Sequence, residues 1–311
     1  MADNEPDFSK FDLDEEPDFS KFDASDADGN AQPERTALGA LGDVGVTGLK
    51  GAVGLVESGI GLADLATGGY AGKIAEDVGL RTKDTQGILD TMYSPAQQFA
   101  NKQVEEADGF LPTIGAALSN PSTIGKAALE SAPLMLGGGV IAKGAQKLGM
   151  GLLGASAFGE GAVGAGSSAE GIRQQTGDGL LTGKQSALAG LSGIGTGAFN
   201  RLGGALSGKL GIGDIDTAIA RNMTGDIGAE VADQGQKNIV RRIIEGGISE
   251  GVFEELPQSV QETVFQNAAL DKPLMEGVPN AAAMGLLTGG AMGAGFNAIP
   301  QKPKGVLGRA A

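Results

Sequence analysis

Residues 133–175 read PLMLGGGVIAKGAQKLGMGLLGASAFGEGAVGAGSSAEGIRQQ, and this stretch decides the fold class. Its larger apolar residues recur at helical spacing, and the positions between them are filled mainly by glycine and alanine. A polar turn at 176–179 separates it from a second Gly-rich stretch at 184–209. We therefore predict an all-α protein with Gly/Ala-rich elongated helices, in which these two stretches form a helical hairpin.

The composition limits both the core and the chemistry. Glycine accounts for 55 of 311 residues, aromatic residues make up 4%, and tryptophan is absent. Few side chains can therefore bury a large area, so we expect a weak core that depends on close backbone approach or on a partner. Histidine and cysteine are absent. Their absence excludes a Ser-His-Asp triad, thiolate nucleophiles, zinc sites with imidazole or thiolate ligands, and disulfide frameworks.

Other segments also have helical patterns. Residues 34–67 place Leu38, Leu41, Leu49, Val53, Val56 and Ile60 near i, i+3, i+4 spacing. Residues 85–107 resemble an ordinary amphipathic helix, bounded by turns at Asp108-Gly109 and Asn120-Pro121. Within 121–210 we predict a helix from Ser122 to Ser131 and a new one starting at Pro133. Residues 226–270 are predicted as helices that break at Gly246-Gly247 and restart at Pro257.

Residues 1–33 form an acidic tail. Residues 1–30 hold eleven acidic residues against Lys10 and Lys21, a net charge of −9 out of −15 for the whole chain. The unit EPDFSKFD occurs twice, at 5–12 and 16–23. High acidity with few apolar residues predicts disorder, and an acidic start without an apolar run is not expected to be a secretory signal. The repeat is either a solubilising tail or a partner-binding element that would use Phe8, Phe11, Phe19 and Phe22.

No charged residue occurs from Gly277 to Gln301. Within this segment, Pro279 and Pro300 bracket about 20 residues that are predicted to be helical. About 20 residues of helix span about 30 Å, close to the thickness of a bilayer core. Small residues four positions apart form a ridge that favours close helix association: Ala281, Gly285, Gly289 and Gly293. The hydrophobicity is too low for a constitutive transmembrane anchor. A buried packing helix and a membrane-inserting helix are both compatible with this pattern.

The motifs that would indicate an enzyme fail in their context. Gly149–Gly154 matches a dinucleotide fingerprint by letters, but no strand pattern precedes it. Gly203–Lys209 matches most of a Walker loop, yet Leu210 stands where serine or threonine would hold Mg²⁺. The carboxylates Glu250, Glu254, Glu255 and Glu262 are interpreted as a solvated or interface-charged helix face rather than as a catalytic pair. We predict no catalytic, cofactor-binding or metal-binding residues, no cofactor and no enzymatic activity.

Several blocks of the sequence resemble internal virion (DNA-ejection) proteins of short-tailed, podovirus-type bacteriophages. They are GEGAVGAGSSAE at 159–170, DGLLTGKQ at 178–185, EGGISEGVFEELPQSVQE at 245–262, NAALDKPLMEGV at 267–278 and AAAMGLLTGGAMGAG at 281–295. The resemblance covers about residues 130–297. It implies storage inside the capsid, passage through the tail, and assembly of a conduit in the host cell envelope. Large members of this group carry a lytic transglycosylase domain, of which Glu57-Ser58 and Glu130-Ser131 here supply only a dipeptide.

The resulting organisation has four parts: the tail at 1–33, a helical region at 34–120, the Gly-rich hairpin at 121–210 and a helical region at 211–311. The resemblance implies a homo-oligomer that contacts other ejection proteins, portal or tail components and a host membrane, with genomic DNA only as cargo. Two alternatives stay open. The chain is a soluble virion or scaffold-type assembly protein, or it is a pore-forming, toxin-like effector.

Overall fold

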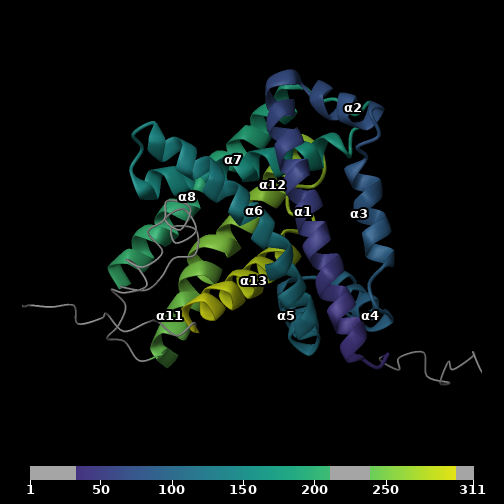
Figure 1. Ribbon diagram of the computed structural model, residues 1–311, viewed down its shortest axis with the longest axis vertical. Helices are drawn as coiled ribbons and strands as arrows, with labels where there is room; N and C mark the ends of the chain where they lie inside the picture. The colour runs from purple at the N-terminus through teal and green to yellow at the C-terminus, as the bar shows by residue number, and fades with distance from the viewer. Residues whose placement is uncertain (1–32, 211–238, 299–311) are drawn as a thin grey trace, which may run out of the picture. The chain divides into compact units, whose positions relative to one another are not determined.

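The computed structural model describes residues 33–210 and 239–298, and within them every element is helical and no strand occurs (Figure 1). This confirms the all-α prediction for the described part of the chain. The elements are α1 (Ala37–Thr67), α2 (Tyr70–Asp77), α3 (Thr82–Thr91), α4 (Pro95–Glu105), α5 (Phe110–Ser119), α6 (Pro121–Lys147), α7 (Leu152–Arg173), α8 (Gly183–Leu210), α11 (Ile239–Glu250), the π-helical turn η2 (Gly251–Glu255), α12 (Leu256–Ala269) and α13 (Val278–Ala298).

The central helices α1, α6, α7 and α8 pack with their backbones close together. A Cβ added to Gly193 of α8 would overlap the carbonyl oxygen of Gly161 in α7, and one on Gly159 of α7 would overlap the carbonyl of Gly138 in α6. The pairings run in opposite directions along α7 and α8, so these two helices are antiparallel. Glycine here replaces bulky side chains as the means of packing, because the missing Cβ lets two helices approach closely.

The second half of the described chain uses the same packing. Helix α13 runs antiparallel to α11, η2 and α12, and α12 runs antiparallel to α8. Gly251 in η2 would place a Cβ 2.7 Å from the carbonyl oxygen of Leu286 in α13. The start of α13 is anchored by Asn280, whose Oδ1 accepts from the backbone N–H of Gly109 at 2.9 Å and whose Nδ2 donates to the Ala107 carbonyl at 2.5 Å.

The predicted break at Pro133 is wrong. Helix α6 starts at Pro121 and continues through Pro133 to Lys147. The ring of Pro133 lies against Gly51 of α1, where an added Cβ would be 2.9 Å from the Pro133 Cγ. This tertiary contact stabilises a kink-prone residue inside the helix, despite the hydrogen bond that proline cannot donate. The chain breaks instead before α7, at Gly149, which has a left-handed φ of 94°.

Two further boundaries differ from the prediction. The single helix expected at 85–107 is divided into α3 and α4, because Ser94 caps α4 through the backbone N–H of Gln97 and Pro95 occupies its first turn. The break expected at Gly246-Gly247 is absent, and α11 continues to Glu250. A Cβ on Gly293 of α13 would overlap the carbonyl of Gly246, so close packing accounts for glycine at this position. The irregularity lies just after it, in η2.

Candidate interaction surface

The charged residues of α1 all face inward. They are Asp43, Lys50, Glu57 and Asp64, each seven residues from the next, so they share one side of the helix. Asp43 accepts from the backbone N–H of Ser94 at 2.7 Å and from its hydroxyl at 2.8 Å. Lys50 pairs with Asp90 and, at 3.8 Å, with Glu130. The polar side of α1 is therefore directed at the interior of the helical assembly.

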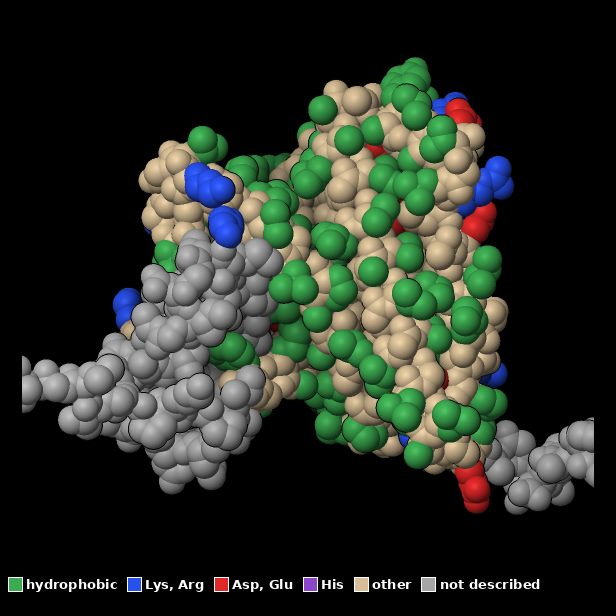
Figure 2. All heavy atoms as spheres, in the orientation of Figure 1, with side chains coloured by type: hydrophobic (Ala, Val, Ile, Leu, Met, Phe, Trp, Pro, Cys, Tyr) green, Lys and Arg blue, Asp and Glu red, His purple; other side chains and the backbone are tan. Residues whose placement is uncertain are grey.

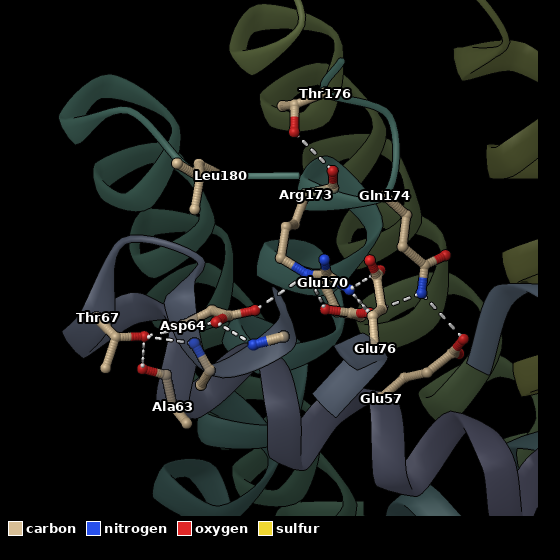
Figure 3. A network of polar contacts seen from close by, with 12 residues as sticks. Glu57, Ala63, Asp64, Thr67, Glu76, Glu170, Arg173, Gln174, Thr176 and Leu180 are labelled. Carbon is tan, nitrogen blue, oxygen red and sulfur yellow. Dashed lines mark hydrogen bonds and ion pairs between the residues drawn. The ribbon is translucent and has the colours of Figure 1, made fainter. Parts of the chain in front are cut away.

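Figure 3 shows the largest polar cluster, which joins the C-terminal parts of α1 and α7 to α2. Arg173 is only 2% exposed, and its guanidinium donates to both carboxylate oxygens of Glu170 at 2.8 and 2.7 Å. The same group lies 3.2 Å from Oδ2 of the fully buried Asp64 and 2.9 Å from Oε1 of Glu76. Three carboxylates thus share one guanidinium, which fixes α7 against α1 and α2.

The hydrogen bonds continue from this cluster to α3. Nε2 of Gln174 donates to Glu170 at 2.8 Å, to Glu57 at 3.2 Å and to the hydroxyl of Thr82 at 3.3 Å. Burial raises the pKa of Asp64, although the N–H of Gly72 and the charge of Arg173 act in the opposite direction. Hydrogen bonding to Glu170 raises the pKa of Arg173 further. Arg173 therefore remains protonated inside the protein, where three carboxylates surround its charge.

The opposite side of α1 is exposed and carries no charge. We call it the α1 outer stripe, and its members follow one another at alternating steps of four and three residues: Leu38, Gly42, Gly45, Leu49, Ala52, Val56, Gly59 and Ala63. Leu38 is 82% exposed. In Figure 2 the face on which α1 lies shows mainly hydrophobic and uncharged atoms, with charged side chains near its edges. The expected apolar spacing in 34–67 is real, but its residues Leu38, Leu41, Leu49 and Val56 do not form a core.

Helix α8 also turns polar residues inward and apolar residues outward, but it exposes charged residues as well. Its buried side combines Ser192, Thr196, Asn200 and Ser207 with Ala189 and several glycines, whereas Ala187, Leu191, Ile194 and Ala198 are exposed together with Lys184, Arg201 and Lys209. The buried hydroxyls bond to neighbouring helices. Thr196 donates to Glu262 of α12 at 3.0 Å, and Ser207 shares a 2.7 Å hydrogen bond with Ser249 of α11. These hydroxyl groups are thus satisfied inside the protein.

Further elements repeat this inversion. On α11 and η2, Ile244, Ile248, Val252 and Phe253 are exposed, while Ser249, Glu250 and Glu254 are buried. On α5, Leu111 and Leu118 face outward and Thr113 is buried. The largest almost fully buried side chains of the described residues include Arg173, Gln97, Glu170, Asn200 and Thr113, and Ile172 is the one apolar member of that group. Helices α3 and α4, by contrast, expose charged pairs such as Arg81–Asp84 and Lys102–Glu106.

The predicted ridge on α13 lies in a seam within the chain. Gly285 faces Ser259 and the Glu255 carbonyl of α12 and η2, and Gly289 faces the side chain of Glu255. Gly293 faces Gly246 of α11, and Ala281 is partly exposed. The ridge thus brings helices together inside one chain. A contact between copies through the same face stays a prediction, and it requires α13 to leave this seam.

The acidic cluster on α11–α12 is not a solvated face. Glu250 and Glu254 are buried, and Glu255 and Glu262 are partly buried, so of the two predicted alternatives, a solvated face and an interface-charged face, the solvated one is wrong for Glu250 and Glu254. Burial raises the pKa of Glu262, and the hydrogen bonds from Thr196 and Gln258 act to lower it. The physical reason is the packing of η2 and α12 between α8 and α13, which leaves these carboxylates among other helices.

The other residues singled out in the sequence lie at or within helices, or outside the described part of the chain. Gly149–Gly154 covers the end of the α6–α7 connection and the first three residues of α7, and Gly203–Lys209 lies inside α8. Residues Phe8, Phe11, Phe19 and Phe22 lie outside the described part of the chain. Among the described residues, no group of acidic side chains is arranged to hold a metal ion. None of the described helices combines the length and the apolar character needed to span a bilayer.

Comparisons with protein-family models, with curated proteins and with solved structures give no match. The candidate interaction surface is therefore defined by its own geometry: exposed apolar residues on α1, α5, α8 and α11, over an interior that holds both polar networks and small apolar clusters. The seven-residue spacing of the charged residues on the inner side of α1 is the sequence signal that could have identified this surface.

Proposed function

We propose that this chain is an internal virion (ejection) protein of a short-tailed bacteriophage, which assembles into a helical, membrane-interacting conduit for genome delivery. It would be stored in the capsid and would act in the host cell envelope as a homo-oligomer, beside other ejection proteins and portal or tail components. DNA would pass only as cargo, and no enzymatic activity or cofactor is assigned. The proposal takes residues 1–33 as a tail that is disordered in the free protein.

The observation that carries the proposal is the inverted distribution of side chains. Water-soluble helices normally turn charge outward and apolar residues inward. Helix α1 does the reverse along its whole length, α5 and α11 expose apolar residues over buried polar ones in the same way, and α8 exposes apolar residues beside Lys184, Arg201 and Lys209. A contiguous exposed apolar surface is typical of a protein that meets lipid or other subunits. The resemblance to ejection proteins in residues 130–297 supplies the biological setting.

Helix packing supports the assembly part of the proposal. The seams rely on glycine against backbone carbonyls rather than on large apolar side chains. Helices in lipid associate in this way, because lipid removes the hydrophobic driving force between them. A conduit of Gly/Ala-rich elongated helices and helical hairpins would use the same close packing between copies.

A soluble virion assembly protein is the second candidate. The exposed apolar faces would then be covered by other virion subunits rather than by lipid. The two candidates predict different behaviour with lipid. The full chain should float with phosphatidylglycerol vesicles and release an entrapped dye if the conduit proposal is right, and should do neither if it is a soluble assembly protein.

The virion assignment has its own test. Mass spectrometry of purified particles should detect the chain, and mass spectrometry of ejected, empty particles should show its loss. Absence from purified particles would contradict both the ejection and the virion-assembly readings, and vesicle leakage without virion association would favour a pore-forming effector.

A further inference from the structure

We propose that the α1 outer stripe is a contact between two copies of this chain, in which α1 packs antiparallel to α1 of the second copy about a two-fold axis near Ala52. The inference deepens the proposed assembly by naming one of its interfaces, and it rests on that proposal only for the expectation of a homo-oligomer. Three features of the stripe support it: the period of its residues, the open space around its glycines and the order of large and small side chains along it.

The period of the stripe indicates a helical partner. The exposed positions Gly42, Gly45, Leu49, Ala52, Val56 and Gly59 alternate steps of three and four residues, a mean of 3.5. A 3.5-residue repeat keeps one side of a helix against another helix that winds around it with a left-handed supercoil. The inward charges repeat every seven residues as well, so both sides of α1 follow the same period.

The glycines of α1 fall into two classes that differ in their surroundings. On the inner side, a Cβ at Gly51 would lie 2.6 Å from the Glu130 carbonyl oxygen, and one at Gly61 would overlap the carbonyl of Gly166. On the outer stripe, a Cβ at Gly42, Gly45 or Gly59 would meet nothing within 4 Å. Glycine weakens a helix by about 1 kcal/mol relative to alanine. The inner glycines offset that cost by close helix contact, and a second helix would give the outer glycines the same role.

The order of large and small side chains along the stripe indicates which helix would pack against it. On either side of Ala52, a large residue comes first and two small residues follow. In an antiparallel pair centred there, Leu49 opposes Val56, Gly45 opposes Gly59, and Gly42 opposes Ala63. A two-fold axis makes such a contact self-complementary, as isologous interfaces require. Antiparallel helices also place opposite ends of their dipoles together, as α7 and α8 do in this chain.

The absence of charge on the stripe argues against a charged partner. All charged residues of α1 lie on its inner side, so the stripe offers neither phosphate contacts for nucleic acid nor ion pairs for an acidic or basic peptide. A lipid surface is the competing occupant. Any apolar helix face can contact lipid. The 3.5-residue period of the stripe, and the same order of large and small residues on both sides of Ala52, are specific to contact with another helix.

Disulfide cross-linking of the full chain in solution tests the proposal without lipid or virions. The chain has no cysteine, so each introduced thiol reports on one position. Ala52→Cys should form a dimer on mild oxidation, since a disulfide needs Cα atoms about 4.4–6.8 Å apart. Gly45→Cys alone should not, because the twin positions would be about 21 Å apart along the helix axis. A mixture of Gly45→Cys and Gly59→Cys chains should cross-link to each other. Lys102→Cys, on the charged side of α4 and away from the exposed apolar faces, is the matched control and should stay monomeric.

Light scattering provides a second measurement. Ala52→Glu should shift the oligomer to monomer with unchanged helical circular dichroism, whereas Lys102→Glu should retain the wild-type mass. The proposal is overturned if Ala52→Cys gives no dimer, if Lys102→Cys cross-links equally well, or if Gly45→Cys alone cross-links as strongly as Ala52→Cys. Protection of the Ala52→Cys thiol by phosphatidylglycerol vesicles without dimer formation in solution would also overturn it, in favour of lipid. Absence from virions would contradict the proposed function and leave this result standing.

Discussion

Gly61 of α1 and Gly166 of α7 lie so close together that a Cβ on Gly61 would overlap the carbonyl oxygen of Gly166. In the same seam, a Cβ on Gly166 would overlap the carbonyl of Ser58, and the Ser58 hydroxyl donates to the carbonyl of Val163 at 2.9 Å. At this point of the seam, α1 and α7 are held together by backbone approach and one buried hydroxyl, in addition to the Arg173 cluster at their C-terminal ends. Since large apolar side chains are scarce in the interior, each such position should be sensitive to a single methyl group.

We predict opposite effects for alanine at two neighbouring glycines of α1. Gly61→Ala should destabilise the protein by about 1–3 kcal/mol, the usual cost of overpacking. Gly59→Ala should be neutral or should stabilise by up to about 1 kcal/mol, because that position is open and alanine favours the helix. Urea unfolding followed by circular dichroism measures both. Equal free energies of unfolding for the two variants would contradict the account of the α1–α7 seam.

The buried guanidinium should be a major stability determinant. Arg173→Met leaves Asp64 and Glu170 buried without their counter-charge, and removal of one partner from a buried pair typically costs about 3–5 kcal/mol. Arg81→Met removes an exposed pair with Asp84 and should cost at most about 1 kcal/mol. Denaturant unfolding of both variants tests this, and a loss at Arg173 no larger than that at Arg81 would show that the cluster is not structural.

The pKa shift of Glu262 predicts a pH dependence of stability. Its folded-state pKa is raised above the ordinary glutamate value of 4.5, so its contribution to stability is fully present below that value and is lost as the pH rises through the raised pKa. Glu262→Gln stays neutral, and it should therefore have a higher Tm than wild type at pH 7 but not at about pH 4. Glu106→Gln, on the exposed end of α4, is the control and should change Tm little at either pH. A lower Tm of Glu262→Gln at pH 7 would contradict the effect of burial on this carboxylate.

The α13 ridge gives a prediction about packing within the chain. Gly289→Leu inserts a branched side chain between α13 and the Glu255 side chain, and should cost about 1–3 kcal/mol. Leu286→Ile nearly conserves volume and is the matched control. Thermal unfolding and vesicle leakage should both be impaired in Gly289→Leu and preserved in the control. Wild-type behaviour of Gly289→Leu would mean that the ridge has no structural role.

The acidic tail gives a prediction about incorporation into particles. Deletion of residues 1–30 should leave the helical circular dichroism nearly unchanged, and should abolish packaging because the Phe-containing repeats and nine net negative charges are lost. Substitution of Phe8, Phe11, Phe19 and Phe22 by serine keeps the charge and separates the two contributions. Normal incorporation of the deleted chain would contradict a partner-binding role for the tail.

The sequence predicted that the elements are helices, but it did not predict which side of each helix turns inward. Glycine and alanine at helical spacing indicated the all-α class, and the glycine-rich turns at Gly109 and Asn120 were placed correctly. Pro133 and Gly246 were misinterpreted as breaks, because the neighbouring helices that accommodate them are distant in sequence. The helical spacing of the apolar residues of α1 does not indicate which side of the helix turns inward, whereas the seven-residue spacing of Asp43, Lys50, Glu57 and Asp64 does. The partners of these charges lie on other helices, and sequence periodicity cannot locate them.

The central claim is that the exposed apolar faces of this protein contact lipid when the conduit assembles. The chain has no tryptophan, so one introduced tryptophan reports on one surface. Ile194→Trp lies on the exposed side of α8, where Ile194 is 70% exposed, and Lys102→Trp lies on the charged side of α4. With vesicles that contain brominated phospholipid, the fluorescence of Ile194→Trp should shift to the blue and be quenched, while that of Lys102→Trp should not change. Unquenched emission from Ile194→Trp in the presence of excess vesicles would contradict the membrane-interacting conduit.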